Sequence, residues 1–481
     1  MNKKIRPLLL GFLAVLILSL ADAGPAAPAS LISELARYAM GLRLADAPEV
    51  VRRQAKLCIL DTIGASVAGI SAEDWRPLLE VERARSGRTE ATVLGAGTKL
   101  SIEAAARVNA YTGDIFEVND LIGGHASIGI VPAVLAVSET TAASGAEVVE
   151  AVIVGIEVAS HVYSSYYYDM KAYTEVGMVP VGFPNSLGAA AAVARLLNLD
   201  ERHTAEAMAI AGTLAGWCPA EVIFGDGGTV KPMVFGASPA TTGITAAYYA
   251  QKGMSGPPNL LESKIGLYAT VAKRSKPDVL VDRNTWYLAK PRRKLHACCG
   301  YLHSALDVII ALRREGARFQ DAAEIRIGMP EYIIPAISKT RPPVSPNDAR
   351  FHAQFMLALA ASESNVIAIA PEHSMQFQTY SERPAVAELM KKIKVVLEPE
   401  LKHYHQCSVT LLDSAGTTML RREGKGPKGS PQNPMTDDEV RAKFRQLVGH
   451  KLGPAKVDEY LTKLDGLDKP GDWHWLINSF K

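Results

Sequence analysis

The segment between residues 109 and 136 carries the residue types that acid–base chemistry needs. It holds three carboxylates and one histidine, namely Asp114, Glu117, Asp120 and His125. Glycines lie beside these side chains, and Ala- and Val-rich runs typical of helices lie on both sides. Acid–base groups on a loop between rigid helices are a common construction for an active site. A solvated polar loop is the alternative that the spacing leaves open.

The first 23 residues have the pattern of a secretory signal peptide. Two lysines and an arginine precede an apolar run from residue 8 to residue 20. This run is shorter than the ~20 residues that a membrane span needs. Small residues at 21–23 offer a cleavage site before Gly24. We therefore expect a cleaved signal peptide and a periplasmic or secreted protein, with an uncleaved anchor as the alternative.

Charge and motif content argue against several classes of function. Residues 1–23 hold three of the 52 Lys and Arg residues and one of the 50 Asp and Glu residues, so the remaining chain carries 49 of each. Because this balance lacks a basic excess, we expect no nucleic-acid partner, and no membrane contact after signal cleavage. Cys-x-x-Cys, His-Glu-x-x-His and Gly-x-Ser-x-Gly do not occur in the sequence. Metal, thiol-redox and serine-hydrolase sites are therefore disfavoured.

The N-terminal half has the pattern of a helical domain. From about residue 30 to residue 252 the sequence is rich in small residues at helical spacing. Asp46 is expected to cap one helix, and Ser144 with Glu147 forms a capping-box pattern before another. The Ala-rich run 186–197 is apolar nearly all round, which predicts a fully buried helix.

The pattern changes to alternating strands and helices beyond about residue 280. Strands are predicted at 324–328, 394–397, 408–412 and 417–421. Helices are predicted at 303–312, 349–361 and 384–392. A Gly- and Pro-rich linker at 424–434 precedes a capping-box pattern at Thr436 and Glu439, which predicts a helix that returns to the first domain.

The predicted fold class is mainly α, with a discontinuous all-helical domain and a smaller α+β domain. The helical domain is expected at 30–279, the α+β domain at 280–423, and the linker with the returning helices at 424–481. A cleft between two such domains is a common place for a ligand site.

Six segments of the sequence resemble the MmgE/PrpD family, which includes 2-methylcitrate dehydratase and cis-aconitate decarboxylase. They run in order over nearly the whole chain, at 57–70, 109–136, 188–200, 231–263, 294–307 and 427–444. The resemblance implies an all-helical domain with a smaller α+β lid domain, usually in a homodimer, and no metal or organic cofactor. It also implies chemistry beside a carboxylate of a di- or tricarboxylate, by dehydration, decarboxylation or epimerisation.

The resemblance also places candidate catalytic residues. Lys231 and Lys294 lie where the family has its site lysines, and such lysines can hold carboxylates and stabilise an enolate-like charge. A surface lysine whose stem covers apolar side chains is the alternative for each. His125 lies at the position of the family's loop histidine and is the candidate for proton transfer together with Glu117. A capping or packing histidine is the alternative for His125.

Three further residues are predicted to contact substrate. These are Asn119, Asp120 and His303, of which Asp120 is expected to orient a lysine or His125. An alternative for His303 is a structural role in orienting the loop around Cys298. We interpret Cys298 and its neighbour Cys299 as packing residues rather than nucleophiles.

Several positions lack the group that the family pattern leads us to expect. A family histidine falls on Asp114, a family acidic residue falls on Asn119, and Leu121 stands where the decarboxylase branch has a hydroxyl residue. Two further family histidines fall on Val179 and Val234. We expect either a substrate with a more apolar tail against Leu121, Val179 and Val234, or loss of the ancestral reaction.

The sequence-based hypothesis is a cofactor-independent lyase for a small-molecule carboxylate, in the first place a dehydratase of a β-hydroxy carboxylate. Glu117 or His125 would remove the alpha proton, and the other would assist the departure of hydroxide. Lys231 and Lys294 would hold carboxylates. The alternatives are an epimerase or decarboxylase of the same family, and a non-catalytic periplasmic carboxylate-binding protein.

Overall fold

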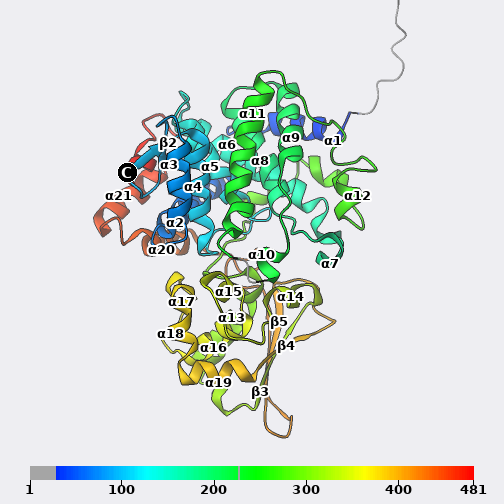
Figure 1. Ribbon diagram of the computed structural model, residues 1–481, viewed down its shortest axis with the longest axis vertical. Helices are drawn as coiled ribbons and strands as arrows, with labels where there is room; N and C mark the ends of the chain where they lie inside the picture. Colours follow the sequence, from blue (N-terminus) through cyan, green and yellow to red (C-terminus); the bar gives the residue numbers. More distant parts are fainter. Residues whose placement is uncertain (1–28, 226–227) are drawn as a thin grey trace, which may run out of the picture.

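The computed structural model describes residues 29–225 and 228–481. Figure 1 shows a larger helical body and a smaller body that combines helices with a sheet. The predicted signal peptide, residues 1–23, lies outside the described residues. Within the described ranges, no helix has the length and apolar character that crossing a membrane requires.

The helical body is built around α8, which α5, α6, α9 and α11 surround. Its helices are α1 (Leu31–Gly41), α2 (Glu49–Gly69), α3 (Arg76–Arg85), α4 (Ile102–Ile115), α5 (Ala126–Ser138), α6 (Gly145–Ser164), α7 (Tyr173–Val176), α8 (Gly182–Leu196), α9 (Glu201–Leu214), α10 (Glu221–Phe224), α11 (Ser238–Gln251) and α12 (Leu267–Val271). Small residues allow the close approach of α6 and α8, since a Cβ atom on Gly188 would lie 2.5 Å from the carbonyl oxygen of Gly155. The prediction of a buried Ala-rich helix is confirmed.

Two local predictions in this body have different outcomes. Ser144 and Glu147 form the predicted capping box at the start of α6. The predicted cap at Asp46 is wrong, because α2 begins at Glu49 with Pro48 as its N-cap. A residue that precedes proline is disfavoured in the helical conformation, so Ala47 cannot easily continue a helix from Asp46.

The helical body also contains a β-hairpin that the sequence did not predict. Strands β1 (Ala91–Val93) and β2 (Thr98–Leu100) pair antiparallel. The side chain of Asn109 on α4 holds this hairpin, since it accepts from the backbone N–H of Leu94 at 2.8 Å and donates to the carbonyl of Thr92 at 2.9 Å. Strands of three residues are too short to show an alternating pattern.

The smaller body is an α+β domain with one four-stranded sheet. The strands are β3 (Glu324–Met329), β4 (Ile393–Leu397), β5 (Gln406–Leu412) and β6 (Thr418–Lys425), in the order β4-β3-β5-β6. Strands β3 and β4 are parallel, and the other two pairs are antiparallel. The helices are α13 (His303–Arg314), α14 (Ile334–Ile337), α15 (Pro346–Arg350), α16 (Ala353–Ser362), α17 (Pro371–Met375), α18 (Phe377–Ser381) and α19 (Pro384–Lys392).

The predicted strands and helices of this domain are confirmed with shifted ends. Strand β6 continues to Lys425, so it takes up the start of the predicted linker. The helix predicted at 349–361 is divided in two, because α15 ends at Arg350 with Phe351 as its C-cap and His352 is the N-cap of α16. Its ring accepts a hydrogen bond from the backbone N–H of Phe355 at 3.1 Å, which satisfies a free donor at the start of α16.

The C-terminal helices return to the helical body. These are α20 (Asp437–Val448), α21 (Pro454–Leu464) and α22 (Trp475–Asn478), and α20 packs against α2 (Figure 1). The predicted capping box of Thr436 and Glu439 begins α20. From this helix, Lys443 donates to the carbonyl of Val118 at 2.6 Å and pairs with Asp61 at 2.8 Å. The last part of the chain therefore holds the loop that carries the candidate acid–base residues.

Candidate active site

Two residues of the loop between α4 and α5 have a left-handed backbone conformation, which is rare outside glycine. Glu117 has a φ of 55° and His125 a φ of 69°. In the described chain, Asn198 is the only other non-glycine residue with a positive φ. This region costs a non-glycine residue about 1–3 kcal/mol and is concentrated at functional sites. The two residues of the loop that the sequence singled out for proton transfer are therefore the two that the fold holds in strained conformations.

A buried cluster of two lysines and two carboxylates lies at this loop. Lys231 Nζ lies 2.8 Å from Asp114 Oδ2. The carboxylate of Glu117 contacts both Lys231 and Lys294, one with each oxygen. All four side chains are at most 2 % exposed. Buried charges are tolerated when each has a partner, and here two cations face two carboxylates.

A chain of hydrogen bonds leads from this cluster to His125. Asn119 Nδ2 donates to Asp114 Oδ1 at 2.7 Å, so the Asn119 side-chain oxygen is left as an acceptor. His125 Nδ1 lies 3.1 Å from that oxygen and must be the donor in this contact. The network thereby assigns the hydrogen of neutral His125 to Nδ1 and leaves Nε2 with a free electron pair. Asn119 and Asp114 thus fix the orientation of the His125 ring.

Burial sets the protonation of the two groups at the ends of this chain. It lowers the pKa of His125 well below 6.5, with a further contribution from the charge of Lys294. His125 is therefore neutral near neutral pH. Burial also lowers the pKa of Lys231 from 10.5 to about 8, against the opposing effect of Asp114. Lys231 is cationic at neutral pH but releases its proton more easily than an exposed lysine does.

These pKa directions predict the pH dependence of any reaction that needs neutral His125 and cationic Lys231. As the pH rises through about 8, Lys231 loses its charge and kcat/KM should fall. On the acid side, kcat/KM should show no loss near pH 6.5, because His125 takes up a proton only well below that value. A kcat/KM profile between about pH 5 and pH 10 measures both limbs. A half-maximal rate at pH 6.5, or a constant rate up to pH 10, would contradict this assignment.

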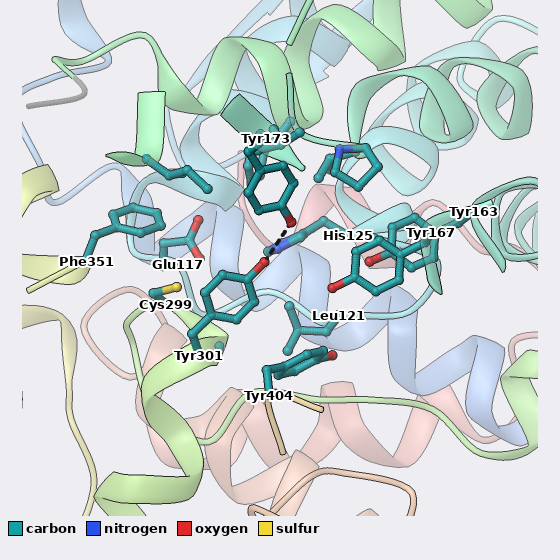
Figure 2. Close-up of a pocket in the computed structure, with 17 residues that line it drawn as sticks. Glu117, Leu121, His125, Tyr163, Tyr167, Tyr173, Cys299, Tyr301, Phe351 and Tyr404 are labelled. Atoms are coloured by element: carbon teal, nitrogen blue, oxygen red, sulfur yellow. Dashed lines mark hydrogen bonds between the residues drawn. The ribbon is translucent and has the colours of Figure 1, made fainter. Parts of the chain in front are cut away.

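A cavity of about 70 Å³ opens beside Glu117 and His125, between the two bodies. The α+β domain contributes Cys299, Phe351 and Tyr404 to its wall, and the helical body contributes the loop and several aromatic residues (Figure 2). Five tyrosines line it, which are Tyr163, Tyr167, Tyr173, Tyr301 and Tyr404. The arrangement places a neutral histidine and a charged cluster at one side of an aromatic cavity.

Comparison with known proteins identifies the family. The MmgE/PrpD N-terminal domain matches residues 33–280, and the MmgE/PrpD C-terminal domain matches residues 296–464. The chain belongs to the MmgE/PrpD family. Cis-aconitate decarboxylase of Mus musculus is 27 % identical to this MmgE/PrpD protein, over 94 % of this chain and 93 % of the relative.

Two further relatives carry the same description. Cis-aconitate decarboxylase of Homo sapiens is 27 % identical over 94 % of this chain and 95 % of the relative. Cis-aconitate decarboxylase of Aspergillus terreus (strain NIH 2624 / FGSC A1156) is 24 % identical over 93 % of this chain and 95 % of the relative. The MmgE/PrpD family and these relatives support a lyase-type enzyme that acts on a carboxylate.

The structure brings the four predicted catalytic residues of this MmgE/PrpD chain together. Glu117 and His125 line the cavity. Lys231 and Lys294 are buried, so the alternative of surface lysines is wrong. Both contact the carboxylate of Glu117, which lines the cavity. Phe235 packs against both Lys231 and His125. Its ring centroid lies 4.2 Å from Lys231 Nζ and 5.2 Å from the ring centroid of His125.

The three predicted substrate-binding residues lie outside the wall of the cavity. Asn119 orients His125, as described above. Asp120 accepts a hydrogen bond from the backbone N–H of Ile122 at 3.2 Å, and burial raises its pKa to about 6. His303 Nε2 lies 3.3 Å from the carbonyl oxygen of Cys298, which fits the structural alternative. Asn119 and Asp120 therefore support the loop, whereas His303 also lines a small adjoining cavity beside Arg292 and Tyr404.

The sequence anticipated the apolar character of the cavity in part. Leu121 and Val179 line it, whereas Val234 does not. The tyrosine wall was not predicted, because the segment 163–173, which supplies three of the tyrosines, is far in the sequence from Tyr301 and Tyr404. One local signal was the run of three tyrosines at residues 166–168, of which Tyr167 lines the cavity.

All five cysteines lie in the described ranges, and each is free and buried. Burial raises the pKa of Cys298 well above 9, and it also raises that of Cys299, so neither favours a nucleophilic thiolate. No group of three or more His, Cys, Asp and Glu side chains in the described part of the chain could hold a metal ion.

Proposed function

We propose that this protein is a cofactor-independent lyase that removes the alpha proton of a carboxylate substrate, with dehydration of a β-hydroxy carboxylate as its reaction. The observation that carries the proposal is the chain from Lys231 through Asp114 and Asn119 to His125. It orients a neutral base toward a cavity that lies next to two buried ammonium groups.

The first step uses the free electron pair on His125 Nε2. This atom accepts the alpha proton, and the electron pair of the broken C–H bond moves toward the substrate carboxylate. Negative charge then increases on that carboxylate, where Lys231 and Lys294 can stabilise it. The same negative charge raises the pKa of His125, because an adjacent anion favours imidazolium.

The second step breaks the C–O bond to the β-hydroxyl group. The electron pair from the alpha carbon forms the C=C bond, and the hydroxyl group leaves as water after it receives a proton. Glu117 contacts both lysines and lines the cavity, so it can pass a proton from Lys231 to the leaving oxygen. Transfer of the proton on His125 back to Lys231 through solvent restores the resting enzyme.

Decarboxylation is the second candidate, and the names of the three relatives favour it. Loss of CO₂ leaves a carbanion that must receive a proton from an acid. His125 Nε2 carries no proton in the resting arrangement, so the Glu117–lysine cluster would have to be the donor. The tautomer of His125 therefore favours proton removal over decarboxylation as the first step.

Incubation of the purified protein with β-hydroxy carboxylates and with cis-aconitate in D₂O tests these candidates. Proton NMR and mass spectrometry follow each compound. Loss of water supports dehydration, and loss of CO₂ supports the second candidate. Deuterium at the alpha carbon without loss of either group indicates an epimerase. Binding of a carboxylate with no chemical change would contradict the lyase proposal.

A further inference from the structure

The small cavity that adjoins the first one lies at the boundary between the two bodies, where Leu121 of the helical body meets Tyr404 of the α+β domain. We propose that this second cavity is the subsite for a second acidic group of the substrate, and that Arg292 is the residue that selects for this group. The inference rests on the proposed carboxylate lyase function and assigns a specificity-determining residue to the same site.

The two cavities share part of their walls. Leu121, Gly300 and Tyr404 line both of them, and Figure 2 shows Leu121 and Tyr404. Leu121 packs directly on Gly300, since a Cβ atom on that glycine would lie 2.9 Å from Leu121 Cδ1. The backbone N–H of Leu121 donates to the carbonyl of Arg292 at 2.9 Å. A ligand that extends past the Leu121 side chain from the first cavity therefore reaches the second one beside Arg292.

The second cavity has a volume of about 10 Å³, which is room for about one water-sized group. It can therefore receive the end of a ligand, but not a whole substrate molecule. A carboxylate needs somewhat more space than a water, and rotation of the partly buried Leu121 side chain can supply it. The reacting part of the substrate stays in the first cavity, beside Glu117 and His125.

The wall of the second cavity is positively charged. It contains three basic side chains, namely Arg292, Arg293 and Lys428. None of the described residues that line it is Asp or Glu. Lys428 pairs with Glu439 at 2.8 Å. His303 and His405 also line the cavity but are neutral near neutral pH, because burial lowers the pKa of His303 well below 6.5 and that of His405 to about 3. The two arginines therefore leave a net positive charge.

Neither arginine pairs with a carboxylate of the described chain. Arg292 donates to the hydroxyl of Tyr404 at 3.3 Å and to that of Tyr168 at 2.8 Å. Arg293 donates to Gln54 Oε1 at 2.7 Å, and its buried Nε has no hydrogen-bond partner. A largely buried guanidinium without an anion is unfavourable, and an acidic group of a ligand supplies the missing negative charge.

Arg292 is the better placed of the two arginines. Its guanidinium is bonded to Tyr404, which also lines the first cavity, whereas that of Arg293 is bonded to Gln54 on α2. Arg292 also lies two residues before Lys294 in the sequence, and two residues of fully extended chain span at most about 7 Å. The backbone positions of Lys294 and Arg292 are therefore close enough for the two side chains to hold two acidic groups of one short molecule.

Calorimetry with the purified full chain tests the subsite with matched pairs of ligands. Glutarate is compared with its monoamide, glutaramate, and succinate with its monoamide, succinamate. Within each pair the length is the same, and one carboxylate is replaced by a neutral amide. We expect the wild type to bind each diacid at least about tenfold more tightly than its monoamide, because a second charge-assisted hydrogen bond forms at Arg292.

Variants of Arg292 separate charge selection from a structural role. In Arg292→Gln the preference should fall to about twofold, the statistical factor for two equivalent ends, while the affinity for the monoamides changes by less than about threefold. Arg292→Lys keeps the charge and should keep a preference of at least about fivefold. A merely structural role would weaken diacid and monoamide equally in both variants, which would overturn the inference.

Arg313→Gln is the matched control. Arg313 is also half-buried, lines neither cavity, and donates to the carbonyl of Val366 at 2.6 Å. Its replacement should leave the preference for diacids at the wild-type value. Loss of the preference in this variant as well would show that the effect is not specific to the second cavity, and would overturn the inference.

The remaining outcomes separate this inference from the proposed lyase function. Equal affinity of the wild type for diacid and monoamide, an unchanged preference in Arg292→Gln, or no binding of either diacid would overturn the subsite and leave the lyase proposal intact. The expected preference, with no chemical change in any carboxylate, would support the subsite and overturn the lyase proposal. Inorganic phosphate tests for a separate anion. Phosphate binding that Arg292→Gln abolishes, without any preference for diacids, would overturn the inference.

Discussion

The His125→Gln variant is expected to lose about 10²–10⁴-fold in kcat on any substrate of this enzyme, because a positioned base contributes a factor of that size. Glutamine has a similar size and can still bond to Asn119, but it cannot accept the alpha proton. Substrate affinity should change little, since the lysines that hold the carboxylate remain. Steady-state kinetics, with the affinity taken from calorimetry, separates the two effects.

A second buried histidine provides the control for this prediction. His161 is fully buried and lies outside the cavity wall, where it contacts the Tyr38 hydroxyl at 2.8 Å and the Val279 carbonyl at 2.5 Å. His161→Gln should keep kcat per folded molecule near the wild-type value, although it can reduce stability. If both variants lose the same factor in kcat, the loss at His125 reflects packing and the role of a base is wrong.

Replacement of Lys231 by methionine is expected to reduce the free energy of unfolding by about 3–5 kcal/mol, the usual effect of removing one partner of a buried ion pair. Asp114 would then be fully buried without its cation. The double variant Lys231→Met with Asp114→Asn removes both charges and should recover most of this stability. It should not recover activity, because the cation that stabilises the enolate-like charge is still missing. Urea unfolding and a rate assay measure the two properties.

An exposed ion pair provides the control for the stability measurement. Lys391 pairs with Glu388 at 2.7 Å, and both side chains are mostly exposed. Lys391→Met should hardly change the free energy of unfolding, because solvent screens such pairs. A double variant of Lys231 and Asp114 that is as unstable as Lys231→Met alone would show that the loss comes from packing rather than from an unpaired carboxylate.

The sequence predicts the fold well where one local pattern dominates. The strands of the α+β domain and the caps of α6 and α20 follow from alternation and from capping boxes. The misplaced cap at Asp46 and the unpredicted hairpin β1–β2 have different causes. In the first case Pro48 overrides a good capping residue, and in the second the strands depend on a tertiary contact with Asn109.

In the candidate site, too, the sequence predicted residues that lie in recognisable local segments, but not roles that depend on tertiary contacts. The loop with Glu117 and His125 and the two lysines could be identified, because each lies in a segment that resembles the family. That Asn119 orients His125 could not be predicted, since this role depends on how three side chains meet. The tyrosine wall was also beyond reach, because the segments that supply it meet only when the two bodies pack together.

Exchange of the alpha proton with solvent is the most direct measurement of the central claim, which is that His125 removes this proton beside the lysine cluster. A turned-over carboxylate is incubated in D₂O with the wild type and with His125→Gln, and deuterium at the alpha carbon of recovered substrate and product is followed by NMR. Our account predicts exchange in the wild type and a rate at least about 10²-fold lower in the variant. Exchange at the wild-type rate in His125→Gln would contradict it, as would wild-type turnover in which the alpha proton is never exchanged or lost.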